Sequence, residues 1–206
     1  EREMDERLAQ RLPPHAVLDT RTGRGVVRLW ANDLDGARAD LEWVRRAGIE
    51  HGSFHTHVNA GAFLAQVLLR FGSVAAAVET AESTAALTDD ADAVWLGPLP
   101  HCEAAFAQAA QGDLAGARAH AEVATAMADA LTLAPGRLWS DMAWLRIADA
   151  AADDDEVVRV GDRMVASGWG RIPEPIHHWR ATYVEGLVAT GRLDDAATVV
   201  AELEAE

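Results

Sequence analysis

Three histidines within seven residues form the densest group of side chains able to do chemistry in this sequence: His51, His55 and His57. Imidazole nitrogens bind zinc and nickel, and the i, i+4 spacing of His51 and His55 would place two of them on one helical face. A glycine and a serine interrupt that spacing at an expected helix start. No thiolate is near, and the nearest carboxylate, Glu50, does not complete a tetrahedral site. We therefore predict exposed histidines at a helix entry, with no metal and no cofactor.

A second arrangement with catalytic potential is His177-His178, which lies close to Glu174 and could pair a base with an acid. A hydrolase also needs a nucleophile, but no serine stands at a suitable distance and Cys102 belongs to a different repeat. All 18 basic residues are arginine, which excludes a phosphate-loop lysine, a Schiff-base lysine and a lysine general base. We predict that the chain is not an enzyme.

The formal net charge of −15 over 206 residues argues against a nucleic-acid-binding surface, because a phosphate backbone would be repelled. A solvated acidic surface is the simpler interpretation. Cys102 is the single cysteine, so an intrachain disulfide is impossible and a reducing, cytoplasmic setting is favoured. No apolar run approaches the roughly 18 residues of a membrane-spanning helix, so we expect no membrane contact.

A repeating pattern, most complete from Gly112 to Ala124, defines the elements that must position any site. With Gly112 as position zero, an apolar residue follows at plus two, a small one at plus five, and small or apolar ones at plus nine and plus twelve. The pattern starts at residues 32, 72, 112, 152 and 191, which are 40, 40, 40 and 39 residues apart. Thr84 is a polar exception in the second copy. The fourth copy is degraded, with Asp154 and Gly161 where apolar residues belong.

Each copy predicts a turn with one helix before it and another after it. The helices expected before the turns are Thr56–Phe71, His101–Gln111, Arg137–Ala151 and Ile176–Thr190. The helices expected after the turns are Leu34–Ala47, Val74–Leu87, Leu114–Leu131, Asp154–Ser167 and Leu193–Glu204. No segment alternates as a half-buried strand does. We therefore predict an all-α fold, an α-solenoid of about five antiparallel helix pairs with a period of about 40 residues.

Residues 26–206 form the predicted repeat domain, and residues 1–25 an N-terminal extension or partial helix pair. Thr20–Gly25 is predicted to be a loop, so the first helix, ending at Trp30, should be short or frayed. Because residue 1 is not methionine and the pattern is running by Asn32, we expect the chain to be part of a longer protein.

Two positions in the pattern have a direct physical role. The residue after each turn is a good helix N-cap in four of the copies: Asp33, Ser73, Asp113 and Asp153. The residue at plus five is small, which lets the two helices of a pair approach closely. The residues at plus five are Ala37, Ala77, Ala117, Val157 and Ala196.

The turn glycine, the cap and the alanine at plus five resemble the tetratricopeptide repeat, lengthened from 34 to about 40 residues. Trp30–Arg38, Gly112–Arg118, Pro173–Pro175 and Tyr183–Ala196 together resemble the helical-repeat region of the large ATP-binding LuxR-type transcriptional regulators. In that family an ATPase module, a superhelical sensor region and a helix-turn-helix share one polypeptide. The resemblance implies an effector- or partner-binding sensor segment that relays a signal to modules outside this chain. A free-standing tetratricopeptide scaffold that binds a protein or peptide is the alternative.

In repeats of this kind the helices before the turns line the binding groove, and four positions per helix should face it. The candidate groove residues are Asn59, Gln66, Phe106, Trp139, Met142, Arg146, His178 and Glu185. They combine apolar bodies with polar anchors, as a site for a small molecule or peptide requires.

The alternative for the aromatic and methionine candidates is that they form core between repeats. Arg146 could instead be held in a structural ion pair by Asp149 or Glu185. Exposed Val199, Val200 and Leu203 on the last expected helix could support self-association through the ends of the solenoid.

Overall fold

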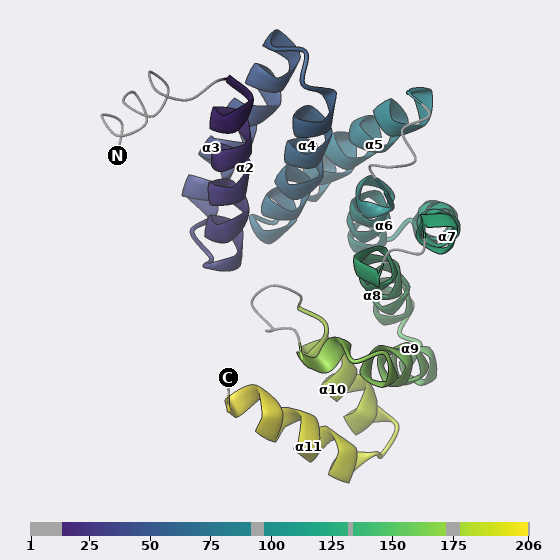
Figure 1. The fold of residues 1–206 in the computed structure, drawn as a ribbon. Coiled ribbons are helices and arrows are strands. Elements are labelled where there is room, and N and C mark those ends of the chain that lie inside the picture. Colours follow the sequence, from purple (N-terminus) through teal and green to yellow (C-terminus); the bar gives the residue numbers. More distant parts are fainter. Residues whose placement is uncertain (1–13, 92–96, 132–133, 172–177, 206) are drawn as a thin grey trace. The chain divides into compact units, whose positions relative to one another are not determined.

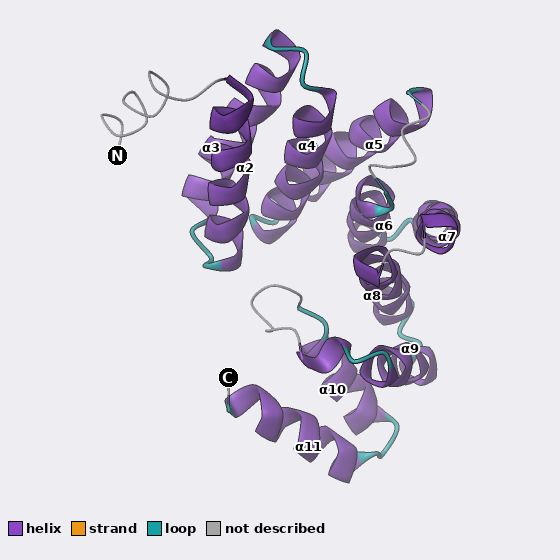
Figure 2. Ribbon diagram, viewed as in Figure 1, coloured by secondary structure: helices purple, strands orange, loops and turns teal. Residues whose placement is uncertain are grey.

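The computed structural model describes residues 14–91, 97–131, 134–171 and 178–205. Within these ranges the secondary structure consists of ten α-helices and one short 3₁₀ helix, without a strand (Figures 1 and 2). The chain divides into two compact units, Glu1–Leu96 and Gly97–Glu206. No helix in the described residues is both long enough and apolar enough to cross a membrane.

The described residues of unit 1 form four helices of equal length, which follow one another through short turns (Figure 1). They are α2 (Pro14–Trp30), α3 (Leu34–Glu50), α4 (Phe54–Arg70) and α5 (Val74–Asp90). Each helix packs against the next one along the chain, and α2 also contacts α4. Leu41, Val44 and Val58 are fully buried in the core of this unit.

The helix α2 corrects the prediction of a loop at Thr20–Gly25, because it runs without interruption through these residues. The hydroxyl groups of Thr20 and Thr22 donate to carbonyls one turn earlier, at 2.7 and 2.8 Å, and so do not compete with the helix. A Cβ on Gly25 would lie 2.9 Å from Cγ of Leu41 on α3. Gly25, which suggested a loop, therefore makes room for the neighbouring helix. It accommodates Leu41 at plus nine, where the next two repeats have alanine.

In unit 2 the residues that the structure describes form six α-helices and the 3₁₀ helix η2 (Trp169–Arg171). The α-helices are α6 (Leu99–Gln111), α7 (Leu114–Leu131), α8 (Ala134–Ala150), α9 (Asp154–Ala166), α10 (Arg180–Ala189) and α11 (Leu193–Glu204). Their main core is built around Trp179, Tyr183, Met164 and Leu145. The helix α10 begins at Arg180, later than the predicted start at position 176, which lies outside the described residues.

All five residues at position zero have a left-handed backbone. Gly72, Gly112 and Gly191 have φ angles of 74°, 90° and 79°, which glycine adopts without a steric penalty. Asn32 and Ala152 have φ angles of 61° and 53° and are the two residues other than glycine with positive φ in the described chain. This conformation ends one helix and reverses the chain into the next.

The predicted N-caps are confirmed at three of the four turns. Asp33, Asp113 and Asp153 each accept a hydrogen bond from the backbone N–H three residues later, at 3.1, 3.0 and 3.1 Å. Ser73 occupies the N-cap position of α5 but makes no capping hydrogen bond through its side chain. The aspartate caps satisfy backbone donors that the first helical turn leaves without partners.

Close contacts between a glycine and a side chain of the neighbouring helix explain two departures from the repeat pattern. A Cβ on Gly61 of α4 would lie 2.5 Å from the hydroxyl oxygen of Thr84, the polar exception on α5. Thr84 is buried, and its hydroxyl donates to the Thr80 carbonyl at 2.6 Å. On α9, a Cβ on Gly161 would lie 2.1 Å from the ring of Tyr183, so this glycine makes room for the tyrosine. In both cases a missing side chain on one helix accommodates a larger one on its neighbour.

Candidate functional site

A hollow of about 520 Å³ lies in unit 1 between α3 and α5, with α4 as its floor. We call this hollow, together with the smaller one described below that adjoins it, the α3–α5 groove. Its α3 side carries the charged residues Arg38, Glu42, Arg45 and Arg46 and ends at Ile49. Successive positions are separated by three or four residues, except that Arg45 and Arg46 are adjacent. They therefore share one face of the helix. The opposite face of α3 supplies the buried residues of the core.

Positive charge predominates on the α3 side of the groove. Arg38 pairs with Glu42, with 2.7 Å between Nε and Oε1. The guanidinium of Arg45 has one partner, the Ser83 hydroxyl, at 3.4 Å, and the guanidinium of Arg46 makes no hydrogen bond or ion pair with any described residue. Within the described part of the chain, these two arginines therefore lack a carboxylate partner, although the sequence as a whole has a formal charge of −15.

The floor of the groove comes from α4 and is mainly apolar. Leu64 and Leu68 line it, and both are almost fully buried. His57 stands beside them, and its Nδ1 donates to the Arg45 carbonyl at 2.8 Å, since a carbonyl can only accept. This bond fixes the imidazole against α3 and links the floor to the basic side.

The smaller hollow of about 350 Å³ continues the groove toward the α3–α4 turn and shares Ile49 and His57 with the larger one. Phe54 and Leu87 also line it, so its walls are mainly apolar. Ile49 is 67% exposed and Leu87 36% exposed. Along α3 the combined groove has the Arg38–Glu42 ion pair at one end, then Arg45 and Arg46, and one turn later its apolar end at Ile49.

The groove predicted from the sequence lies on another side of α4. Asn59 and Gln66 were the candidates there, and both are partly exposed. Asn59 lies two residues after His57 and therefore points about 200° away around the helix. Its side-chain amide is hydrogen-bonded to Nε2 of His55 at 2.7 Å. The observed α3–α5 groove and the predicted groove thus use opposite sides of α4.

In unit 2, three of the predicted groove residues pack with the core. Met142 is 6% exposed and belongs to the cluster around Trp179. Phe106 and Trp139 are half-buried against the same cluster, with their ring centroids 6.5 Å apart. Met142 is therefore a core residue, which was the alternative to a groove residue. Phe106 and Trp139 pack on the core but also reach the surface.

Arg146 has partners other than those named from the sequence. Its guanidinium donates to the His178 carbonyl at 2.6 Å and to the Thr182 hydroxyl at 3.2 Å. It therefore joins α8 to the start of α10, and neither Asp149 nor Glu185 takes part. His178 precedes α10 rather than lying on it, and its side chain is exposed, as is that of Glu185.

The three clustered histidines belong to different environments. His51 is exposed at the C-cap of α3, so it does not share a helix with His55 on α4. The Nδ1 of His57 is occupied by the Arg45 carbonyl. Across the described residues, no group of three histidine, cysteine, aspartate or glutamate side chains is placed to hold a metal ion.

The second arrangement, His177-His178 with Glu174, falls partly outside the described residues, which lack both position 174 and position 177. Cys102, the single thiol, is fully buried on α6. Burial, and to a lesser degree Glu103, raises the pKa of this thiol well above its ordinary value. The thiol therefore stays protonated near neutral pH, which is unfavourable for a nucleophile.

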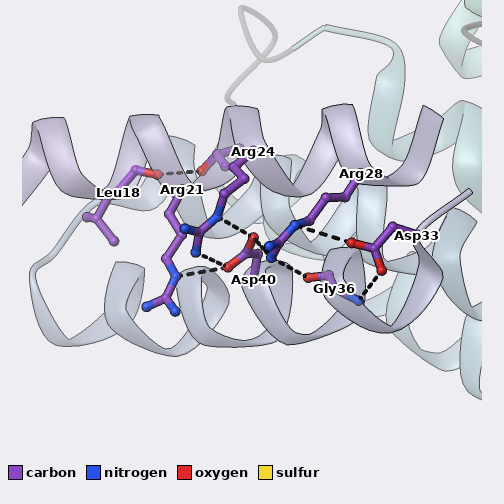
Figure 3. Close-up of polar contacts among 8 residues, drawn as sticks. Leu18, Arg21, Arg24, Arg28, Asp33, Gly36 and Asp40 are labelled. Carbon is purple, nitrogen blue, oxygen red and sulfur yellow. Dashed lines mark hydrogen bonds and ion pairs between the residues drawn. The ribbon is translucent and has the colours of Figure 1, made fainter. Parts of the chain in front are cut away.

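A second charged cluster, which was not predicted from the sequence, joins α2 to α3 (Figure 3). The buried carboxylate of Asp40 accepts from Arg21 at 3.0 Å, from Arg24 at 2.6 Å and from Arg28 at 2.7 Å. Burial acts to raise the pKa of Asp40, but the hydrogen bonds from Arg24 and Arg21 outweigh it and hold the pKa below its ordinary value. The guanidinium of Arg21 also lies 4.2 Å from the ring centroid of Trp43. We call these four charged residues the Asp40 cluster. Because its ion pairs run from α2 to α3, it acts as a clamp that holds the two helices together.

No protein-family model matches the chain, and no curated protein matches it. Its structure is similar to the nearly identical TPR-like repeats of a kinesin light chain-like protein from Podosopora anserina. The TM-score is 0.58 at 20% identity, covering 94% of this chain and 95% of the other. A single-substitution variant of those repeats gives a TM-score of 0.59 at 20% identity, covering 94% and 96%. The predicted fold class, an all-α tetratricopeptide-like solenoid, is confirmed.

Proposed function

We propose that the chain is a non-catalytic module that binds a protein partner, with the α3–α5 groove as its binding surface. The observation that carries this proposal is the exposed Ile49 side chain beside two arginines that have no carboxylate partner among the described residues. Exposed apolar side chains next to charged anchors are typical of sites that recognise peptides. The tetratricopeptide-like framework supports the proposal, because it presents paired helices as rigid walls.

The finer proposal is that this module is the effector- or partner-sensing segment of a LuxR-type transcriptional regulator in the cytoplasm. Its support is the resemblance of Trp30–Arg38, Gly112–Arg118 and Tyr183–Ala196 to the helical-repeat region of that family. ATP binding and DNA binding would then belong to modules outside this chain. A free-standing scaffold is equally compatible with the fold. The coding sequence on either side distinguishes them, since only the regulator has an ATPase and a helix-turn-helix.

Photo-crosslinking in the cells that make the protein tests the groove as a binding surface. A photoreactive amino acid at Ile49 should give a discrete adduct with one partner protein. The matched control is Val165 on α9, which is apolar and 49% exposed but lies outside the groove. Equal labelling at both positions, or no adduct at Ile49, would contradict the proposal.

The predicted groove residues on the other helix faces remain proposed binding residues for the same partner or for a small-molecule effector. Trp139→Ala and Arg146→Ala test them. A binding role predicts lost binding with an intact fold. Unfolding of unit 2 in both variants would instead assign them to the core and to the bridge between α8 and α10.

A further inference from the structure

We infer that the α3–α5 groove takes an acidic amphipathic helix of a partner protein, with its carboxylates toward Arg45 and Arg46 and an apolar anchor at Ile49. This inference rests on the proposed function and adds the chemistry and the direction of the partner segment. It follows from the distribution of charge, the shape of the groove and the exposure of its apolar end.

Charge complementarity selects an acidic segment. Three arginines of α3 line the groove against one glutamate, Glu42, which already pairs with Arg38. Glu79 and Glu82 of α5 do not line the groove. A carboxylate that approaches Arg45 and Arg46 therefore meets guanidinium groups that the lining glutamate does not occupy, since Glu42 pairs with Arg38, and bidentate pairing favours carboxylates there. A basic segment would be repelled.

The dimensions favour a helix over an extended strand. The groove follows α3 from Arg38 to Ile49, and this stretch of helix is about 16 Å long. A partner helix of about three turns matches that length and lies between two helices on an apolar floor, as amphipathic helices do in other helical grooves. The edge strand that an extended peptide would pair with is absent from the described residues.

The apolar end gives the bound helix a direction. Ile49, Phe54 and Leu87 surround the smaller hollow, which offers almost no polar partner. A bulky apolar side chain fills such a hollow and removes Ile49 from water, whereas a small anion would leave it exposed. The partner segment thus carries its acidic residues about one helical turn from its apolar anchor, with the anchor toward the Ile49 end of the groove.

Selection from a random library of displayed peptides about three helical turns long, against the whole chain, tests the inference without a known partner. The enriched peptides should share acidic residues about one helical turn from a bulky apolar residue. Binding of the best peptide is then measured by fluorescence anisotropy. Arg46→Glu should weaken it by about tenfold or more, with loss of most of its salt dependence. Ile49→Ser should weaken it by a similar factor with the salt dependence kept.

Matched controls separate groove effects from changes in net charge or stability. Arg118→Glu makes the same charge change on the exposed side of α7, and Val165→Ser makes an equivalent apolar-to-polar change on α9. Both should leave binding unchanged.

The outcomes separate the inference from the proposed function. Enriched peptides that are basic or uncharged, yet sensitive to Ile49→Ser, would overturn the acidic partner while the groove stands. Peptides insensitive to both groove substitutions would place binding elsewhere. Failure to enrich any peptide would contradict peptide binding itself.

Discussion

The α2–α3 joint, within the first helix pair of unit 1, and the α9–α10 joint, between two successive helix pairs of unit 2, are closed by different means. In unit 1 the buried Asp40 holds three arginines of α2. In unit 2 the contact depends on shape, because Gly161 and Gly186 make room for large side chains of the facing helix. The repeat pattern therefore specifies that two helices meet, but leaves the chemistry of their contact open.

The two joints should respond to different perturbations. A charged clamp is sensitive to the protonation of its carboxylate, whereas a close apolar contact is sensitive to volume. Unit 2 also has a polar cluster, in which Tyr183 and Arg192 donate to Asp162. The Asp162 side chain is 46% exposed, against 2% for Asp40, so solvent screens its contacts.

Removing the central aromatic side chain of unit 2 should have the largest effect. Trp179 is fully buried, and its indole N–H has no hydrogen-bond acceptor in the described structure. Trp179→Ala therefore tests packing alone and should lower the free energy of unfolding by about 3–5 kcal/mol in urea titrations. Hydrogen exchange should show the loss of protection in α8, α9 and α10. A loss spread equally over α2–α5 would contradict the assignment of this core to unit 2.

Neutralising the clamp of unit 1 should have the next largest effect. Asp40→Asn leaves three arginines without their carboxylate and should lower the free energy of unfolding at pH 7 by about 3 kcal/mol. Because the pKa of Asp40 is lowered on folding, the carboxylate stabilises the fold above its unfolded pKa of about 3.9. That contribution is lost as the pH falls through the lower folded value. The difference between wild type and variant should therefore shrink in titrations below about pH 4.

Asp162→Asn is the matched control for the clamp. The pKa of Asp162 is also below its ordinary value: burial acts to raise it, but hydrogen bonds from Arg192 and Tyr183 outweigh burial. Its exposure should limit the loss to about 1 kcal/mol or less. An equal loss in both variants would remove the distinction between a buried clamp and an exposed one.

Filling the space left by a glycine should destabilise the α9–α10 joint. A Cβ on Gly186 would lie 2.7 Å from Cγ1 of Val157, the largest residue at plus five. Gly186→Ala should lower the free energy of unfolding by about 1–3 kcal/mol. In the Val157→Ala background the same change should cost much less.

A Cβ on Gly23 of α2 would meet no described atom within 4 Å, so Gly23→Ala should instead stabilise by a few tenths to about 1 kcal/mol.

Sequence periodicity predicted the helix pairs because the turn, the cap and the small residue at plus five are local requirements. Ala37, Ala77 and Ala117 are fully buried, as their places in the pattern demand. The loop prediction at Thr20–Gly25 was wrong because its glycines suggest a loop when considered alone. The reason for Gly25 lies in Leu41, sixteen residues away and on the next helix.

The candidate site was harder to predict than the fold. The pattern indicates which residues face a neighbouring helix, but not how far apart two neighbouring helices stand at the surface. The α3–α5 groove depends on that spacing. A signal was present in the sequence, since Arg38, Arg45 and Ile49 are separated by whole turns on the face of α3 opposite its core. The role of Arg146 could not be found this way, because its partner is a backbone carbonyl.

The smallest predicted effect compares the turns of the two units. Asn32 in unit 1 and Ala152 in unit 2 both have positive φ, but asparagine tolerates this conformation much better than alanine. Ala152→Gly should therefore raise the free energy of unfolding by about 0.5–1 kcal/mol, while Asn32→Gly should change it by only a few tenths. Thermal and urea unfolding of both variants measure the difference. Equal effects would show that the α8–α9 turn holds no more backbone strain than the α2–α3 turn. Ala152 would then be tolerated at positive φ as well as Asn32 is.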